Sequence, residues 1–220
     1  MSDTSPVTKA RFRDPFSGLS HLASAFIALL VMAFLVFQAS LRGDAWHIVS
    51  FTIFGICMVL MFGTSALYHL YQGSDAKILQ LKRIDHMAIF AMIAGTYTPM
   101  CLIPLRDNIG WTLFAAVWGI AGSGILLKIF WIGAPRWLST VIYLAMGWAC
   151  VFGLSTMKAT MPAVSFDWLV YGGIAYTVGA IVYATKWPDP WPESFGFHEI
   201  WHLFVMAGAF SHAVSIYYLL

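Results

Sequence analysis

The sequence predicts an all-α integral membrane protein, a bundle of seven transmembrane helices with a cytoplasmic N-terminus and an outside C-terminus. Of its 220 residues, 60% are hydrophobic and 10% charged, and the mean hydropathy is +0.77. A chain of this size could not bury so much apolar surface in the core of a soluble protein. The sequence also divides into seven apolar stretches of about 20 residues, the length that crosses a bilayer core. Lys and Arg residues are concentrated in every second connector between these stretches.

Three spans are predicted in the first half of the chain. The span 19–40 follows a basic segment and is too long for a signal-peptide core, so we interpret it as a retained helix. The span 46–70 ends where the polar segment 71–83 begins. The span 84–105 follows that segment and ends at Arg106. Each boundary is therefore a polar or charged connector.

Four spans are predicted in the second half: 110–131, 137–158, 167–186 and 197–219. Three prolines in 187–192 forbid a helix there, which separates the last two spans. No connector is long enough to form a domain. We therefore expect a short cytoplasmic segment, 1–18, and one transmembrane domain, 19–220.

The orientation follows from the positive-inside rule. With a cytoplasmic N-terminus, three basic residues, Arg42, Arg106 and Lys158, fall outside. Nine fall inside: Lys9, Arg11, Arg13, Lys77, Lys82, Arg83, Lys128, Arg136 and Lys186. This bias indicates a cytoplasmic N-terminus, and an odd number of spans then places the C-terminus outside.

Charge and cysteine content exclude two classes of function. A net charge of +2, spread over loops, gives no surface for nucleic acid. Cys57, Cys101 and Cys150 lie within apolar spans without CxxC spacing, which argues against a disulfide framework and a thiolate metal site. The expected partners are membrane lipids, as environment and as candidate substrate.

Polar residues at span ends point to a metal site, because such groups are costly in a membrane. The predicted topology brings His69, Asp85, His198 and His202 to the cytoplasmic side. Histidines four residues apart share one helix face, so His198 and His202 can point into one cavity. Three imidazoles suit zinc with a fourth position open to water. Asp85 could position that water.

Each residue also has a structural explanation. His69 alone could be an interfacial, hydrogen-bonded histidine, and Asp85 could pair with nearby Lys82, Arg83 or His86. His212 lies about 15 Å along its helix from His202 and cannot share the site. We expect His21 and His212 to make contacts between helices, His47 to be interfacial, and His86 to lie outside the direct ligand set.

The segment His198–His202 also reads as H-E-x-x-H, the zinc protease signature in which the glutamate is the general base. That interpretation makes the protein an intramembrane metalloprotease. No further acidic or histidine motif of a protease accompanies it. Glu199 in a first helical turn has a simpler explanation, since its charge complements the helix dipole. The protease is therefore a minor alternative.

The motif residues carry a family resemblance that covers nearly the whole chain. The run Ser65–His69, the pair Asp85–His86 followed by Ala94–Pro99, and His198–His202 with His212 beyond are similar to the hemolysin III proteins of bacteria. These belong to the progestin and adipoQ receptor (PAQR) family, which includes the adiponectin receptors. Asp14 and His21 fit the family's first motif, whereas Ser17 stands where an Asn is usual.

The resemblance implies a seven-helix bundle in the bacterial inner (plasma) membrane. It also implies a zinc ion bound by His69, His198 and His202 and reached by Asp85 through water. Such a site suits metal-dependent hydrolysis of a lipid amide or ester, ceramide-like substrates included. Ser65 could stabilise an oxyanion, although a hydrogen bond to His69 is the favoured expectation. The alternative is a membrane sensor, regulator or hemolysis-associated protein with a structural zinc.

Overall fold

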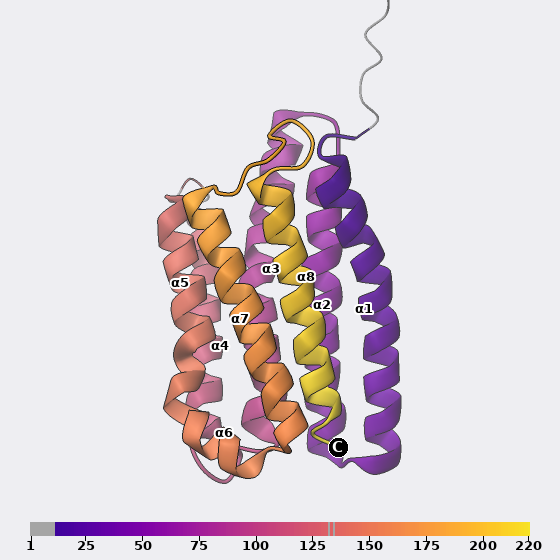
Figure 1. Cartoon of the computed structure of the whole chain (residues 1–220), viewed down its shortest axis with the longest axis vertical. Coiled ribbons are helices and arrows are strands. Elements are labelled where there is room, and N and C mark those ends of the chain that lie inside the picture. Colours follow the sequence, from indigo (N-terminus) through magenta and orange to yellow (C-terminus); the bar gives the residue numbers. More distant parts are fainter. Residues whose placement is uncertain (1–11, 132, 134) are drawn as a thin grey trace, which may run out of the picture.

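The computed structural model describes residues 12–131, 133 and 135–220. In this part of the chain, the regular elements are all helices. They pack side by side into an elongated bundle (Figure 1). In chain order they are α1 (Pro15–Arg42), α2 (Ala45–Leu70), α3 (Asp75–Leu102), α4 (Gly110–Phe130), α5 (Arg136–Trp148), a 3₁₀ segment (Ala149–Gly153), α6 (Leu154–Thr160), α7 (Ala163–Thr185) and α8 (Phe197–Tyr217).

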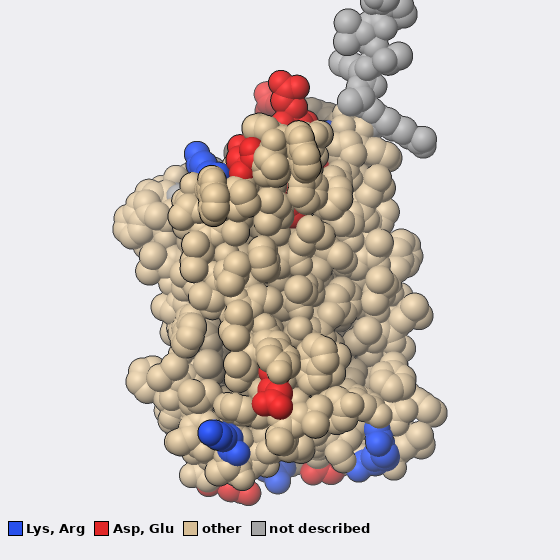
Figure 2. Space-filling model, viewed as in Figure 1, with Lys and Arg blue, Asp and Glu red and all other residues tan. Residues whose placement is uncertain are grey.

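The bundle has the form of an all-α membrane protein. Within the described residues, six helical stretches are long and apolar enough to cross a membrane: α1, α2, α4, Trp137–Thr160, α7 and α8. Charged side chains gather at the two ends of the visible face, and the middle is almost entirely uncharged (Figure 2). The chain is therefore an integral, multi-pass membrane protein.

The predicted span 84–105, which corresponds to α3, is not among these six stretches. Its apolar stretch is diluted by polar residues such as Thr96, Tyr97 and Thr98, which are buried within the bundle. Packing against other helices lets α3 be less hydrophobic than a helix that faces lipid. The prediction of seven spans therefore rests on α3 and stays a prediction, as does the orientation of the termini.

The predicted start of the third span was wrong. The helix α3 begins at Asp75, so most of the predicted connector 71–83 is helical. Ser74 precedes the helix and Asp75 lies in its first turn, where a carboxylate favours helix formation. The fifth predicted span, 137–158, agrees with the apolar stretch Trp137–Thr160, inside which a 3₁₀ segment separates α5 from α6. At the N-terminus, residues 1–11 lie outside the described residues, and α1 already begins at Pro15.

The packing brings four helix ends together at one end of the bundle. The start of α1, the end of α2 and the start of α8 lie at the upper end in Figure 1, where α3 also begins. Gly95 lets α3 approach α2, because a Cβ there would lie 2.7 Å from Cys57 Cβ. The close approach of these helices gathers side chains from distant parts of the chain at this end.

Candidate metal centre

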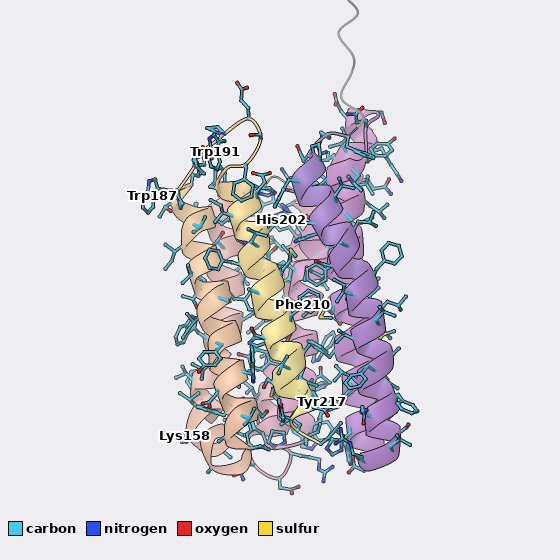
Figure 3. All side chains as sticks on the ribbon, turned by 45° about the vertical axis from the view of Figure 1, so that its right-hand side comes forward. Lys158, Trp187, Trp191, His202, Phe210 and Tyr217 are labelled. Carbon is cyan, nitrogen blue, oxygen red and sulfur yellow. The ribbon has the colours of Figure 1, made fainter. Side chains whose placement is uncertain are left out.

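Three imidazoles from two helices meet near the upper end of the bundle. His69 lies in the last turn of α2, and His198 and His202 lie in the first turns of α8. One ligand atom from each lies within 4.8 Å of the others. His202 is fully buried. In Figure 3, His202 lies near the upper end of α8, at the end of the bundle where Trp187 and Trp191 also lie. Phe210 and Tyr217 lie farther down the same helix.

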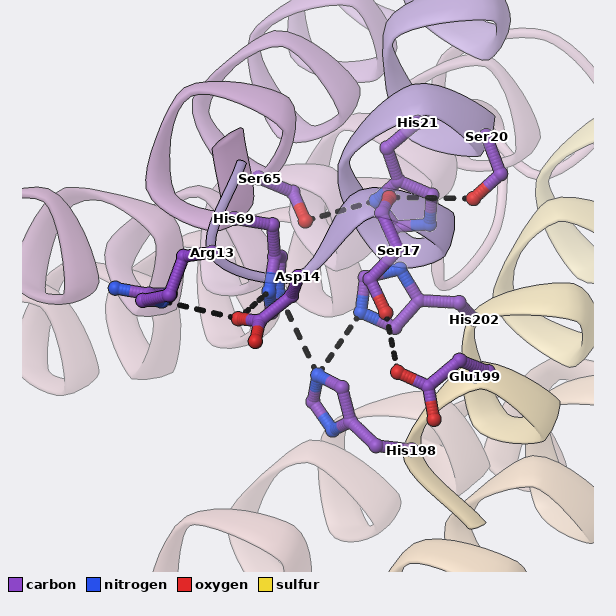
Figure 4. Close-up of polar contacts among 10 residues, drawn as sticks. All are labelled: Arg13, Asp14, Ser17, Ser20, His21, Ser65, His69, His198, Glu199 and His202. Atoms are coloured by element: carbon purple, nitrogen blue, oxygen red, sulfur yellow. Dashed lines mark hydrogen bonds and ion pairs between the residues drawn. The ribbon is translucent and has the colours of Figure 1, made fainter. Parts of the chain in front are cut away.

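The spacing of the ring nitrogens matches a metal centre. The Nε2 atom of His198 lies 3.4 Å from that of His69 and 3.2 Å from that of His202. Tetrahedral zinc with Zn–N bonds of about 2.0–2.1 Å places its ligand nitrogens about 3.3–3.4 Å apart. The donor set therefore fits a tetrahedral ion with one position left for another ligand. Figure 4 shows the three rings converging.

Local structure at the start of α8 sets the direction of two of these rings. The backbone N–H of Phe197 donates to Asp189 Oδ1 at 2.9 Å, which holds the preceding loop against the helix. The N–H of Gly196 donates to Glu199 Oε2 at 2.9 Å, the reciprocal half of a capping box. These bonds fix where the helix begins, and hence which face carries His198 and His202.

Asp14, just before α1, orients the third ring. Its Oδ2 atom lies 2.9 Å from His69 Nδ1 and 3.1 Å from Arg13 Nε. Burial alone would raise the pKa of Asp14, but the hydrogen bonds from His69 and Arg13 outweigh burial and hold the pKa below its usual value. A carboxylate partner at Nδ1 leaves Nε2 as the His69 nitrogen that faces the centre, the position that a metal ligand requires. We did not predict this contact from the sequence.

Ser65 has a different partner from the one expected. Its hydroxyl lies 2.8 Å from His21 Nδ1, and no hydrogen bond joins Ser65 to His69 in the described residues. The His21 ring in turn packs against the His202 ring, with centroids 3.9 Å apart. The prediction of a Ser65–His69 bond was wrong, because His21 from α1 is the hydrogen-bond partner of the Ser65 hydroxyl instead. Ser65 therefore supports the centre through His21.

Asp85 lies beside the centre without joining the three nitrogens. It is 7% exposed and lies inside α3, not at the helix start, because α3 begins earlier than predicted. Its carboxyl group interacts with Ser65 and His69. No Lys or Arg forms an ion pair with it in the ranges that the structure describes, so the expected alternative pairing with Lys82 or Arg83 is not found.

A cavity of about 1070 Å³ adjoins the centre. His69, Asp85 and His198 line one part of it. Many of the other lining residues are apolar. Two of them, Trp148 on α5 and Ile174 on α7, are also 55% and 56% exposed on the outer surface of the bundle. The cavity therefore extends from the polar centre to a surface that faces the apolar exterior. An acyl chain has the size and chemistry to enter it.

Glu199 is held by structural contacts. Its Oε2 atom accepts from Gly196, and its Oε1 atom accepts from the hydroxyl of Ser17 at 2.9 Å. Both carboxylate oxygens are thus engaged: Oε2 caps the start of α8, and Oε1 joins α8 to Ser17 on α1 (Figure 4). A general base needs a free oxygen near the attacking water. This geometry disfavours the protease alternative.

The remaining histidines lie outside the trio. His212 Nε2 contacts the carbonyl oxygen of Leu169 at 3.2 Å, between α8 and α7. His47 Nδ1 lies 2.7 Å from Asp44 Oδ1 at the start of α2. The ring of His86 faces the cavity, and its Nδ1 atom is buried without a hydrogen-bond partner.

Comparison with known proteins identifies the family. The family model described as "Haemolysin-III related" matches residues 10–213. The Hemolysin-3 homolog of Bacillus subtilis is 39% identical over 193 residues, covering 88% of this chain and 87% of the relative. Hemolysin-3 of Bacillus cereus is 36% identical over 194 residues, covering 88% of this chain and 85% of the relative. The Adiponectin receptor protein of Drosophila melanogaster is 23% identical, covering 88% of this chain and 47% of the relative. This chain belongs to the haemolysin III family and is related to the adiponectin receptors.

Proposed function

We propose that this protein is a zinc-dependent hydrolase that cleaves an amide or ester bond of a membrane lipid. The observation that carries the proposal is the Nε2 spacing of His69, His198 and His202, beside a cavity that also contains Asp85. A metal centre open to a lipid-sized cavity favours catalysis over a closed structural site.

Each group of residues around the centre would have a different role in the reaction. Zinc, when bound by the three histidines, would polarise a carbonyl group and lower the pKa of nearby water toward about 7. Asp85 would accept a proton from the attacking water on a carboxylate oxygen and donate it to the leaving amine or alcohol. Ser65 and His21 would hold the His202 ring in place. The apolar walls would hold the acyl chain and exclude bulk water.

The membrane arrangement completes the proposal. We infer that α3 also crosses the bilayer, which gives seven spans, with the N-terminus and the metal centre on the cytoplasmic side of a bacterial inner membrane. The bias of nine Lys and Arg residues against three supports this orientation. Two of the nine, Lys9 and Arg11, lie outside the described residues.

The test combines metal content with lipid turnover. Purified protein would be analysed for zinc by mass spectrometry and incubated with liposomes containing ceramide or ester lipids, and released fatty acid would be measured. We expect His202→Ala to lose zinc and activity, and Asp85→Asn to keep zinc but release no fatty acid. His47→Gln, at the other end of α2, is the matched control. Wild-type turnover by Asp85→Asn would refute the proposed role of Asp85.

A non-enzymatic sensor or hemolysis-associated protein is the second candidate. The Asp14–His69 and Ser17–Glu199 contacts tie α1 to α2 and α8 around the centre, as a structural metal site would. The names of the Bacillus relatives refer to hemolysis. Stoichiometric zinc without release of fatty acid from any lipid in the panel would favour this candidate.

A further inference from the structure

A buried lysine lies in the cavity outside the metal centre. Lys128, near the end of α4, is only 2% exposed and lines the same cavity as Asp85. Its ammonium group donates to Ser139 Oγ on α5 at 2.6 Å. The side chain therefore does not reach the outer surface in the way that snorkelling lysines do.

Lys128 has no anionic partner in the chain as far as it is described. The ion pairs there join other residues, and no interaction between Lys128 and Asp85 is found: Asp85 interacts with His69, Ser65 and Arg13, among others. A buried charge that is not paired is strongly disfavoured. A serine hydroxyl satisfies one ammonium donor of three and supplies no charge. The site therefore lacks a negative group.

The surroundings of Lys128 add further positive charge and hydrogen-bond donors. Lys82 and His86, both on α3, interact electrostatically with each other and with Lys128, and both line the cavity. The buried Nδ1 atom of His86 lacks a partner. Two lysines and an imidazole whose buried Nδ1 atom lacks a partner match the donor set that binds carboxylate or phosphate oxygens.

We propose that Lys128, with Ser139, His86 and Lys82, binds the anionic group of a lipid, a carboxylate or a phosphate, whose acyl chain occupies the apolar part of the cavity. The anionic group supplies the negative charge that the chain lacks. The apolar part of the lining, to which partly exposed residues of α5 and α7 such as Trp148 and Ile174 contribute, would accommodate the chain. If the protein is the hydrolase proposed above, this inference names its substrate class, an anionic lipid. Binding of the lipid is tested separately and does not depend on whether the lipid is cleaved.

The experiment measures lipid binding by the full chain in neutral detergent, using native mass spectrometry. The probes are palmitate, phosphatidylglycerol, phosphatidylcholine and inorganic phosphate. The variant is Lys128→Gln. Lys158→Gln is the matched control, because Lys158 is an exposed lysine at the opposite end of the bundle (Figure 3). Zinc content is measured on every sample, so that loss of the metal centre is detected independently.

We expect palmitate or phosphatidylglycerol to bind wild type more tightly than phosphatidylcholine does. Lys128→Gln should weaken this binding about tenfold or more, the usual effect of losing a charged hydrogen bond, with zinc content unchanged. Lys158→Gln should bind like wild type. The proposal would be overturned if Lys128→Gln bound these lipids as tightly as wild type does, or if Lys158→Gln lost as much affinity as Lys128→Gln. It would also be overturned if wild type bound phosphatidylcholine as tightly as the anionic lipids. Inorganic phosphate binding as tightly as the lipids would overturn the assignment to a lipid.

A second variant distinguishes a binding lysine from a structural one. Without lipid, replacing an unpaired buried charge with an apolar side chain should not lower stability. Lys128→Met should therefore melt at or above the wild-type temperature in lipid-free detergent, while phosphatidylglycerol should raise the melting temperature of wild type only. A lower melting temperature for lipid-free Lys128→Met would mean that the lysine is part of a structural pair and would contradict the proposal. Absence of lipid hydrolysis would leave both results unaffected.

Discussion

Asp14 Oδ2 lies 2.9 Å from His69 Nδ1, across 55 residues of sequence. The contact links the start of α1 to the end of α2 and fixes the ring of one candidate metal ligand. Carboxylate–histidine–metal arrangements raise the basicity of the ligand and hold its tautomer. The N-terminal helix therefore contributes to the centre, although none of the three proposed ligands lies on it.

Asp14→Asn should weaken zinc binding by about 10- to 100-fold, the usual effect of removing such a partner. The amide retains the shape of the side chain but loses its charge. Zinc affinity would be measured by competition with a chromophoric chelator. Asp107→Asn is the control, because Asp107 is almost fully exposed between α3 and α4. Equal affinities for wild type and Asp14→Asn would show that the contact does not tune the centre.

The same residue predicts a pH dependence of stability. The pKa of Asp14 is lower in the folded protein than in the unfolded chain, because hydrogen bonds from His69 and Arg13 outweigh the effect of burial. Its stabilising contribution is therefore complete above the unfolded pKa, about 3.9, and is lost as the pH falls through the folded pKa. In zinc-free protein, the melting temperatures of wild type and Asp14→Asn should differ at neutral pH and converge in acid. A constant difference across this range would contradict the prediction.

Glu199→Gln separates a structural glutamate from a protease base. The carboxylate accepts hydrogen bonds from Gly196 N–H and Ser17, and the amide can keep only part of them. We expect stability to fall by about 0.5–1.5 kcal/mol. Zinc content and any lipid turnover should stay at wild-type levels. Glu193→Gln, in the exposed loop before α8, is the control. Abolished turnover of a peptide substrate by Glu199→Gln would instead support the protease.

The meeting of His69, His198 and His202 could be anticipated because it depends on few assumptions. Alternating spans place the end of α2 and the start of α8 at the same membrane face, and the 3.6-residue helical period puts His198 beside His202. Neither step requires knowledge of side-chain packing. The roles of these residues as zinc ligands stay a prediction, as does the role of Asp85.

The contacts that support the trio depend on packing between distant helices. Asp14 before a proline at a helix start is a recognisable N-cap pattern, yet nothing local indicates that it pairs with His69. His21 replaced His69 as the partner of Ser65 for the same reason. The early start of α3 did leave a signal, since Ser74 and Asp75 form a helix-start pattern. The charged residues that follow obscured it, because they resemble a connector.

Gly172→Ala tests the packing that joins α7 to α8 along the cavity. A Cβ at Gly172 would meet the His212 ring and would lie 3.1 Å from the carbonyl oxygen of Gly208. The helices must separate or His212 must move, which should cost about 1–3 kcal/mol. At Gly173 no atom lies within 4 Å of an added Cβ, so Gly173→Ala should leave stability unchanged or raise it slightly. Unfolding of both variants in detergent, followed by circular dichroism, gives the difference. Equal stability of the two would mean that α7 and α8 do not pack as closely as Gly172 and His212 indicate.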